Sequence, residues 1–246
     1  MLDKTCPTPI YYQLKELIRE KIENGEWQPG DLIPSERELC EQHGISRMTV
    51  RQALTELVNE GLLRRERGKG TFVAKPKIKQ QLTQLTSFSE DMRARGKKPG
   101  AKILRLENTL AKPRVAKALQ IEPEQRIVVI ERLRLADGEP MAIETCHLFF
   151  EGCERILNED LSGSLYELLS QKYGLIPTRA VQQMEAAICN QREMELLQLE
   201  RGSPVLLNKR TTFAQNGQPF EYTESVYRGD KYTFYAELTA RRDHAV

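Results

Sequence analysis

Apolar residues recur at helical spacing in two stretches of the first 61 residues. A repeat of three to four residues predicts a helix that buries one face. The apolar stripes are Ile10, Leu14, Leu17, Ile18 and Ile22 in the first stretch, and Val50, Leu54, Leu57 and Val58 in the second. Two amphipathic helices are therefore expected, over about residues 9–24 and 47–60.

Polar residues and glycines between these stretches predict a further short helix. Ser35 with Glu38 three residues later forms a capping box, so this helix should begin at Ser35. Gly44 can take the left-handed conformation that ends it. Ser46 can cap the next helix, and Gly61 follows as its stop. The order predicts two helices separated by a tight turn.

A β-hairpin should follow the third helix. Gly68, Lys69 and Gly70 lie between two short apolar runs, so they are expected to form a hairpin tip with a positive charge and a bare backbone. Residues 34–73 therefore predict a helix-turn-helix followed by a β-hairpin wing.

Four polar residues lie off the apolar stripe near the start of the third helix. A recognition helix places base- and phosphate-contacting residues at these positions. They are Arg47, Thr49, Arg51 and Gln52. The alternative is a solvated basic helix beside an ordinary hairpin. Capping box, helix spacing, glycine stop and basic wing occur together and in order, which favours DNA binding.

The second part of the chain contains a weak internal repeat. Residues 119–122 match 197–200, Arg132 matches Arg210, and 138–141 match 217–220 after a one-residue slip. Each half is typical of strand, short helix, strand, turn and strand. Residues 161–173, between the halves, look helical. We expect an antiparallel sheet of two related halves with helices on one face, and a ligand pocket between the halves.

The predicted fold is α+β in two domains. Residues 1–75 should form a winged helix-turn-helix domain, and 85–246 an effector-binding and dimerisation domain. Residues 76–84 are polar, basic and contain Pro76, so they are expected to be a solvated linker. The alternative for this linker is a hinge that also contacts DNA phosphates.

Composition narrows the function classes. The chain has 246 residues, of which 39% are hydrophobic and 29% charged, with a net charge of +2. No apolar run is long enough for a membrane span, and no signal-peptide core is expected. Five cysteines without a Cys-x-x-Cys predict neither a disulfide framework nor a zinc site. A cytoplasmic protein without metal or cofactor is expected.

The distribution of charge is more informative than the total. Residues 46–79 contain nine Lys or Arg and three Glu. This local surplus lies on the predicted recognition helix, the wing and the following segment. Positive charge at these places is what neutralisation of DNA phosphates requires.

Two arginines stand out in the second domain. Arg132 and Arg134 are two apart on a predicted strand, so they should point to the same face. Two arginines on one face repel each other unless an anion lies between them, and Arg suits bidentate binding of phosphate or carboxylate. The alternative is a pair of solvated side chains on an open sheet face.

Hydroxyl and carboxylate groups could complete an anion site. Ser87 or Ser89 can cap a helix running to Arg95, and Ser164 with Tyr166 opens another helix. Further candidates for contacting sugar hydroxyls lie on the second strand of each half: Glu144, His147, Glu221 and Tyr227. The alternatives are helix capping for the serines, rim salt bridges for the carboxylates and a packed side chain for His147.

The motifs of the first domain closely resemble the GntR family of bacterial winged-helix regulators. The resemblance rests on residues 34–39, 46–54 and 68–73. It implies that Arg37 and Arg47 reach the major groove, since Arg to guanine is the commonest specific contact. It also implies that the wing around Gly68 enters the minor groove. The expected DNA-binding residues are Ser35, Arg37, Ser46, Arg47, Thr49, Arg51, Gln52, Gly68, Lys69 and Gly70.

The second domain resembles the HutC subfamily of these regulators, whose effector domain shares the fold of chorismate lyase. Residues 85–92, 132–135, 140–144 and 225–234 carry the resemblance, which is greatest to the branch controlling N-acetylglucosamine use. It implies an amino-sugar 6-phosphate effector. Phosphate would meet Ser89, Arg132, Arg134, Ser164 and Tyr166, and sugar would meet Glu144, Glu221 and Tyr227. Ser87 and Phe88 would close over the ligand, with His147 as a further candidate.

The sequence therefore predicts a ligand-controlled transcription repressor. It should bind a near-palindromic operator as a homodimer. Related regulators use this fold for other sugar phosphates or for acids such as urocanate, so these stay open. An activator also stays open, because the sign depends on where the operator lies. An enzyme with an attached DNA-binding module is less favoured, since fold analogy is its main support.

Overall fold

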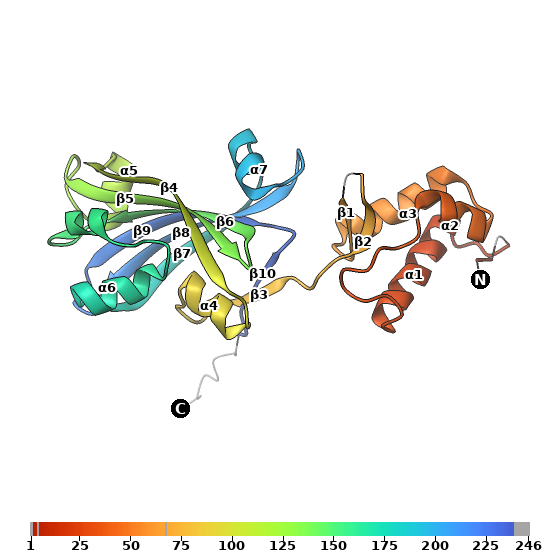
Figure 1. Cartoon of the computed structure of the whole chain (residues 1–246), viewed down its shortest axis with the longest axis horizontal. Helices are drawn as coiled ribbons and strands as arrows, with labels where there is room; N and C mark the ends of the chain where they lie inside the picture. The colour runs from red at the N-terminus through yellow and green to blue at the C-terminus, as the bar shows by residue number, and fades with distance from the viewer. Residues whose placement is uncertain (1, 4, 67, 239–246) are drawn as a thin grey trace, which may run out of the picture. The chain divides into compact units, whose positions relative to one another are not determined.

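The computed structural model describes residues 2–3, 5–66 and 68–238. The chain forms two compact units, Met1–Pro76 and Lys77–Val246. The first contains three helices and a hairpin, and the second is built around a large antiparallel sheet (Figure 1). The predicted α+β class is confirmed.

The first unit follows the local signals of its sequence. Its elements are α1 (Ile10–Glu23), α2 (Glu36–His43), α3 (Arg47–Asn59), β1 (Leu63–Glu66) and β2 (Gly70–Val73). Ser35 caps α2, and the Glu38 carboxylate accepts a hydrogen bond from the backbone N–H of Ser35 at 2.7 Å. Gly44 ends α2 with φ of 59°, and Ser46 caps α3. These predicted boundaries are confirmed.

The apolar stripes of α1 and α3 form the core of this unit. Leu14, Ile18, Val50, Leu54 and Leu57 are each almost completely buried. Strands β1 and β2 pair in antiparallel fashion to form the predicted hairpin. Arg67, beside the tip, lies outside the described residues.

The second unit contains a six-stranded antiparallel sheet in the order β4-β5-β6-β9-β8-β7. Its strands are β4 (Pro99–Leu110), β5 (Arg126–Ala136), β6 (Glu139–Leu148), β7 (Pro177–Ile188), β8 (Pro204–Ala214) and β9 (Pro219–Arg228). Helices α5 (Pro113–Leu119) and α7 (Gln191–Leu197) occupy equivalent places in the two halves and end in left-handed Gln120 and Gln198. The structure thus follows the predicted repeat, with β6 and β9 meeting at the centre.

Helices cover both faces of the sheet, so the prediction of helices on one face is wrong. Helices α5 and α7 pack on one face, and α4 (Phe88–Ala94), the 3-10 helix η1 (Cys153–Asn158) and α6 (Leu165–Tyr173) lie on the other (Figure 1). The continuous apolar run 127–130 explains this, because residues of both parities need burial. Helix α6 also begins at Leu165 rather than near residue 161.

Part of the expected linker is a strand. Residues Ile78–Gln81 form β3, which pairs in parallel with β10 (Tyr232–Tyr235). Ile78 is buried in a cluster with Tyr227 and Tyr232. A solvated tether is therefore the wrong description of residues 78–81, because an apolar side chain and a row of backbone groups find partners near the end of the chain.

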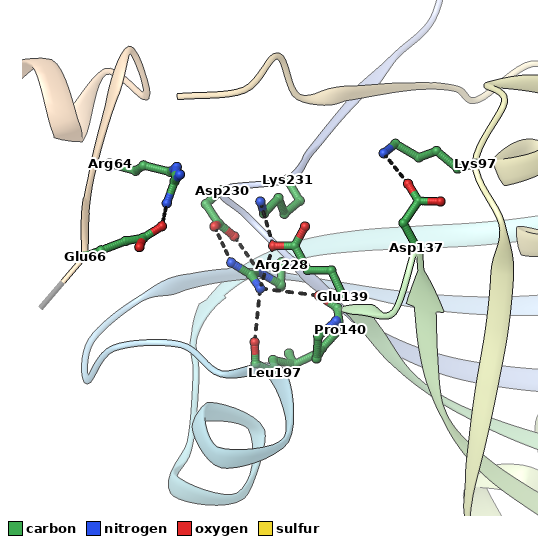
Figure 2. Close-up of polar contacts among 10 residues, drawn as sticks. All are labelled: Arg64, Glu66, Lys97, Asp137, Glu139, Pro140, Leu197, Arg228, Asp230 and Lys231. Atoms are coloured by element: carbon green, nitrogen blue, oxygen red, sulfur yellow. Dashed lines mark hydrogen bonds and ion pairs between the residues drawn. The ribbon is translucent and has the colours of Figure 1, made fainter. Parts of the chain in front are cut away.

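Arg228, the last residue of β9, fixes the turn into β10 (Figure 2). Its guanidinium pairs with Asp230 at 2.6 Å and donates to the carbonyl oxygens of Pro140 and Leu197 at 3.4 and 3.2 Å. Lys231 pairs with Glu139 at 2.8 Å in the same network. These contacts tie α7, the start of β6 and the start of β10 together, and so hold the partner strand of β3.

Candidate functional site

A pocket lies on the sheet face that α4 and α6 cover. Its floor is formed by side chains of β5, β6, β9 and β8. Alternate residues of a strand share a face, and the strand register aligns them in rows across the sheet. One row across the sheet contains Arg132, Glu144, Ser225 and Asn208. The neighbouring rows contribute Arg134 with Tyr227, and Thr223 with Arg210.

The other walls of the pocket come from four different segments. They are Gln80 on β3, Thr86 and Ser87 before α4, Phe88 and Ser89 in α4, and Leu165 and Tyr166 in α6. The cavity between them is about 40 Å³, room for only a few water molecules. A ligand of sugar size therefore requires one wall to move.

The two arginines of β5 are buried in different surroundings. Both Arg132 and Arg134 are 2% exposed. Arg132 forms an ion pair with Glu144 and donates to the carbonyl oxygen of Leu161 at 3.3 Å. Arg134 donates to Ser89 Oγ at 2.9 Å, and its guanidinium carbon lies 4.6 Å from the centre of the Phe88 ring.

The positive charge of Arg134 is only partly offset, by the nearby carboxylate of Glu144. Its Nε and Nη1 atoms are buried and have no hydrogen-bond partner among the described residues. Burial, together with repulsion from Arg132, lowers the pKa of Arg134. Buried charges are normally paired and hydrogen-bonded. The guanidinium is therefore poised to bind an anion.

Two carboxylates lie at different places in the pocket. Burial opposes the ionisation of Glu144, but Arg132 and Arg134 outweigh it and hold the pKa of Glu144 below its ordinary value. Glu221 accepts from the hydroxyls of Tyr166 at 2.7 Å and Thr212 at 2.8 Å, all through one carboxylate oxygen. Burial and the nearby Glu221 raise the pKa of Tyr166 well above its ordinary value, so Tyr166 stays a hydroxyl donor.

Most of the residues expected at an effector site line this one pocket. They are Ser87, Phe88, Ser89, Arg132, Arg134, Glu144, Tyr166, Glu221 and Tyr227. The alternative of solvated arginines is excluded by the burial of Arg132 and Arg134. The described helices also begin where the serines predict, since Ser87 caps α4 and Ser164 caps α6.

Two expected residues do not line the pocket. His147 lies on the opposite face of the sheet, where its Nδ1 is 3.1 Å from the carbonyl oxygen of Tyr222. It is three residues from Glu144, and an odd separation on a strand reverses the face. Burial lowers its pKa, so His147 is a packed side chain. Ser164 Oγ accepts from the backbone N–H of Glu167 and acts as a helix cap.

Sequence reasoning missed several pocket residues. They are Gln80, Thr86, Leu165, Asn208, Arg210, Thr223 and Ser225. Arg210 carried a signal, because the internal repeat aligns it with Arg132. The positions of three others on the pocket face could be read from their even spacing along a strand: Asn208 with Arg210 on β8, and Thr223 and Ser225 with Glu221 and Tyr227 on β9. Gln80 carried none, since it reaches the pocket only through the pairing of β3 with β10.

The expected DNA-binding residues are exposed in the first unit, except Thr49, which is partly buried. The side chains of Arg37 and Arg47 are 85% and 81% exposed, and they pair loosely with Glu41 and Glu36 at 3.5 and 3.2 Å. Thr49, Arg51 and Gln52 line one shallow groove on α3. Ser35 and Ser46 are helix caps, while Gly68, Lys69 and Gly70 lie at the hairpin tip.

No helix among the described residues is long and apolar enough to cross a membrane. No cluster of three or more His, Cys, Asp or Glu side chains in residues 2–3, 5–66 and 68–238 is placed to hold a metal ion.

Two families match the chain, one for each unit. Residues 10–73 match "Bacterial regulatory proteins, gntR family", and residues 94–233 match the UTRA domain. Together these matches cover the helices and hairpin of the first unit and the six-stranded sheet of the second.

Curated relatives match over nearly their whole length. The HTH-type transcriptional repressor NagR of Bacillus subtilis (strain 168) is 47% identical over 95% of this chain and 96% of its own. The histidine utilization repressor of Pseudomonas putida is 34% identical over 92% of this chain and 90% of its own. The mannosyl-D-glycerate transport/metabolism system repressor MngR of Escherichia coli (strain K12) is 30% identical, covering 92% and 94%.

Solved structures are similar to this chain over most of its length. PhnF from Mycobacterium smegmatis superposes with a TM-score of 0.62 and 30% identity, covering 94% of this chain and 99% of that chain. A possible transcriptional regulator, YydK from Bacillus subtilis, gives a TM-score of 0.57 and 25% identity, covering 93% and 99%.

Proposed function

Because the chain belongs to the GntR family and carries a UTRA domain of the HutC type, it is a DNA-binding transcriptional repressor, and we propose that an amino-sugar phosphate controls its operator binding. N-acetylglucosamine 6-phosphate and glucosamine 6-phosphate are the proposed effectors, and the regulated genes those of amino-sugar uptake and catabolism. The repressor acts as a homodimer on a near-palindromic operator, since a two-fold protein matches a two-fold site. Operator contacts come from the start of α2, from α3 and from the hairpin tip.

The unpaired guanidinium of Arg134 is the observation that carries the proposal. The pocket is lined by three arginines and two glutamates, which leaves one net positive charge. Ser89 Oγ already accepts from Arg134, so its own hydroxyl hydrogen is available to an anion. A phosphate between Arg132, Arg134 and Ser89 would satisfy the buried N–H groups and relieve the repulsion between the arginines.

The remainder of the pocket suits a polyhydroxylated ring. Glu144, Glu221 and Tyr227 present acceptors and a hydroxyl beyond the arginines. Carboxylates accept hydrogen bonds from sugar hydroxyls in the plane of the ring. A small planar acid such as urocanate would use the arginines but has no hydroxyl groups to donate to Glu144 and Glu221.

The effector would open the pocket at its α4 wall. The segment from Thr86 to Ser89 has only the short α4 behind it, whereas the floor is the middle of a six-stranded sheet. Because the cavity is smaller than a sugar phosphate, this segment is the wall we expect to move. It follows β3 directly, so its movement would change the β3–β10 pairing and the segment leading to the DNA-binding unit.

Gln80 tests this coupling, because it lies on β3 and lines the pocket. Effector binding should weaken operator binding by about 5- to 150-fold, the usual range of coupling between two sites. Gln80→Leu should reduce that factor while the free protein still binds operator. Gln81→Leu, the matched control on the next residue of β3, should leave the factor unchanged. Equal factors in both variants would refute the coupling through Gln80.

Thermal unfolding with a panel of ligands tests the effector class. The panel is N-acetylglucosamine 6-phosphate, glucosamine 6-phosphate, glucose 6-phosphate, N-acetylglucosamine and urocanate. A ligand that binds only the folded state raises the midpoint. We expect a shift with the two amino-sugar phosphates and none with unphosphorylated sugar. A shift with urocanate alone would overturn the sugar-phosphate assignment. If a ligand raises the midpoint but leaves operator affinity unchanged, the regulatory role of the pocket would be overturned.

A further inference from the structure

Asn208 presents a buried hydrogen-bond acceptor that no described residue satisfies. It lies on β8, lines the pocket and is 3% exposed. Its Oδ1 atom has no hydrogen-bond partner among the residues that the structure describes. A buried carbonyl oxygen without a partner costs free energy comparable to a lost hydrogen bond. A bound ligand that donates to this atom would recover that cost.

The strand register places Asn208 opposite the arginines. Arg132, Glu144, Ser225 and Asn208 are direct cross-strand neighbours on β5, β6, β9 and β8. Strands lie about 4.8 Å apart, so the main chains at the two ends of this row are separated by about 14 Å. Side chains extend inward from both ends. A ligand whose anion meets Arg132 and Arg134 therefore directs its opposite end toward β8.

Arg210 supplies the complementary group beside Asn208. The two residues are two apart on β8, share the pocket face and both line the pocket. Arg210 Nε donates to Gln182 Oε1 at 3.1 Å, which anchors the base of its guanidinium. Asn208 Oδ1 can only accept and the Arg210 guanidinium can only donate. A secondary amide has one N–H donor and one carbonyl acceptor, so it matches this pair.

We propose that Asn208 and Arg210 form an amide-recognition subsite for the N-acyl group of the effector. Asn208 Oδ1 accepts from the amide N–H, and the guanidinium of Arg210 donates to the acyl oxygen. The subsite rests on the proposed function, since the phosphate at Arg132 and Arg134 sets the direction of the ligand. It narrows the effector to N-acylated amino-sugar phosphates, because a free ammonium group only donates and has no acceptor to offer the Arg210 guanidinium.

Affinities of three ligands for wild-type protein and two variants test the subsite. The ligands are N-acetylglucosamine 6-phosphate, glucosamine 6-phosphate and 2-deoxyglucose 6-phosphate, measured by calorimetry on the full chain. Wild-type protein should bind the N-acetyl compound tightest. Asn208→Leu removes the acceptor at nearly the same volume and should reduce the preference over the 2-deoxy compound about tenfold. Asn208→Asp should shift the preference toward glucosamine 6-phosphate, whose ammonium group would pair with the carboxylate.

Thr223→Val is the matched control on the same pocket floor. The hydroxyl of Thr223 donates to Cys146 Sγ at 3.7 Å, so its removal should change the affinity of all three ligands equally. Unchanged preferences in a folded Asn208→Leu and in Asn208→Asp would overturn the subsite while leaving the sugar-phosphate function standing. Failure of wild-type protein to bind any of the three would overturn both, and tighter binding of glucosamine 6-phosphate by wild-type protein would overturn the subsite alone.

Discussion

Replacing Arg134 with Met should stabilise the free protein and abolish its response to effector. Met has a similar length and can pack against Phe88, but it carries no charge. The substitution removes an unpaired buried charge, whose desolvation costs several kcal/mol. It loses the contact with the Phe88 ring, about 2 kcal/mol when desolvated, and the bond to Ser89, about 1 kcal/mol. The balance is a gain of about 1–2 kcal/mol.

Adding effector should reverse the order of the unfolding midpoints of wild-type protein and Arg134→Met. One kcal/mol shifts the midpoint of a domain of this size by about 2–4 °C, so the variant should unfold about 4 °C above wild-type protein without ligand. Effector at about 100 times its Kd adds about 2.7 kcal/mol to wild-type protein and nothing to the variant. With ligand, wild-type protein should therefore be the more stable.

Differential scanning calorimetry of the second unit, paired with an operator-binding assay, measures both effects. Operator binding by Arg134→Met should persist and no longer respond to effector. Arg179→Met is the control, because Arg179 also lies over a phenyl ring, that of Phe213 at 3.7 Å, but is exposed and outside the pocket. A variant less stable than wild-type protein would refute the cost assigned to the partly unpaired Arg134, and a normal ligand shift would refute the phosphate contact.

Three further predictions concern other parts of the molecule. Arg47→Ala should weaken operator binding about tenfold or more, the equivalent of 1–3 kcal/mol for a base contact, without changing the unfolding midpoint; normal operator affinity would exclude that contact. His147→Gln should leave effector affinity unchanged and make the free energy of unfolding less dependent on pH. Burial lowers the pKa of His147 in the folded state below 6.5. The contribution of neutral His147 to stability is therefore present above about pH 6.5 and is lost as the pH falls toward the folded pKa. An unchanged slope of midpoint against pH would contradict this. Gly229→Ala should destabilise the second unit by about 1–3 kcal/mol in urea titrations, because a Cβ would lie 2.6 Å from the carbonyl oxygen of Pro204. Gly163→Ala is the control and should have little effect, because a Cβ at Gly163 would meet open space.

Local sequence signals were sufficient for the first unit. A capping box, a left-handed glycine and an apolar stripe each act within a few residues, so Ser35, Gly44 and Ser46 could be assigned without knowing the fold. The internal repeat likewise predicted the order of strands and helices in the second unit. The period of two on strands placed Arg132 and Arg134 on one face before the structure showed that face to be buried.

The same period of two places His147 on the face opposite Glu144, because the two residues are an odd number of positions apart. For Asn208 the parity was also readable, but nothing in the sequence indicated that its carboxamide oxygen would be buried without a partner. That depends on which side chains surround it, and packing brings those from several strands and helices.

What the sequence by itself determined is the identity and boundaries of the elements in the first unit, the order of strands and helices in the repeated halves of the second, and the faces on which charged residues lie, because these follow from neighbours along the chain. Tertiary structure alone decided that helices cover both faces of the sheet and that Gln80 reaches the pocket through the pairing of β3 with β10. It also decided that Arg134 is buried with unpaired N–H groups. The physical reason is that burial and hydrogen-bond satisfaction depend on segments far apart in sequence, which local patterns do not register.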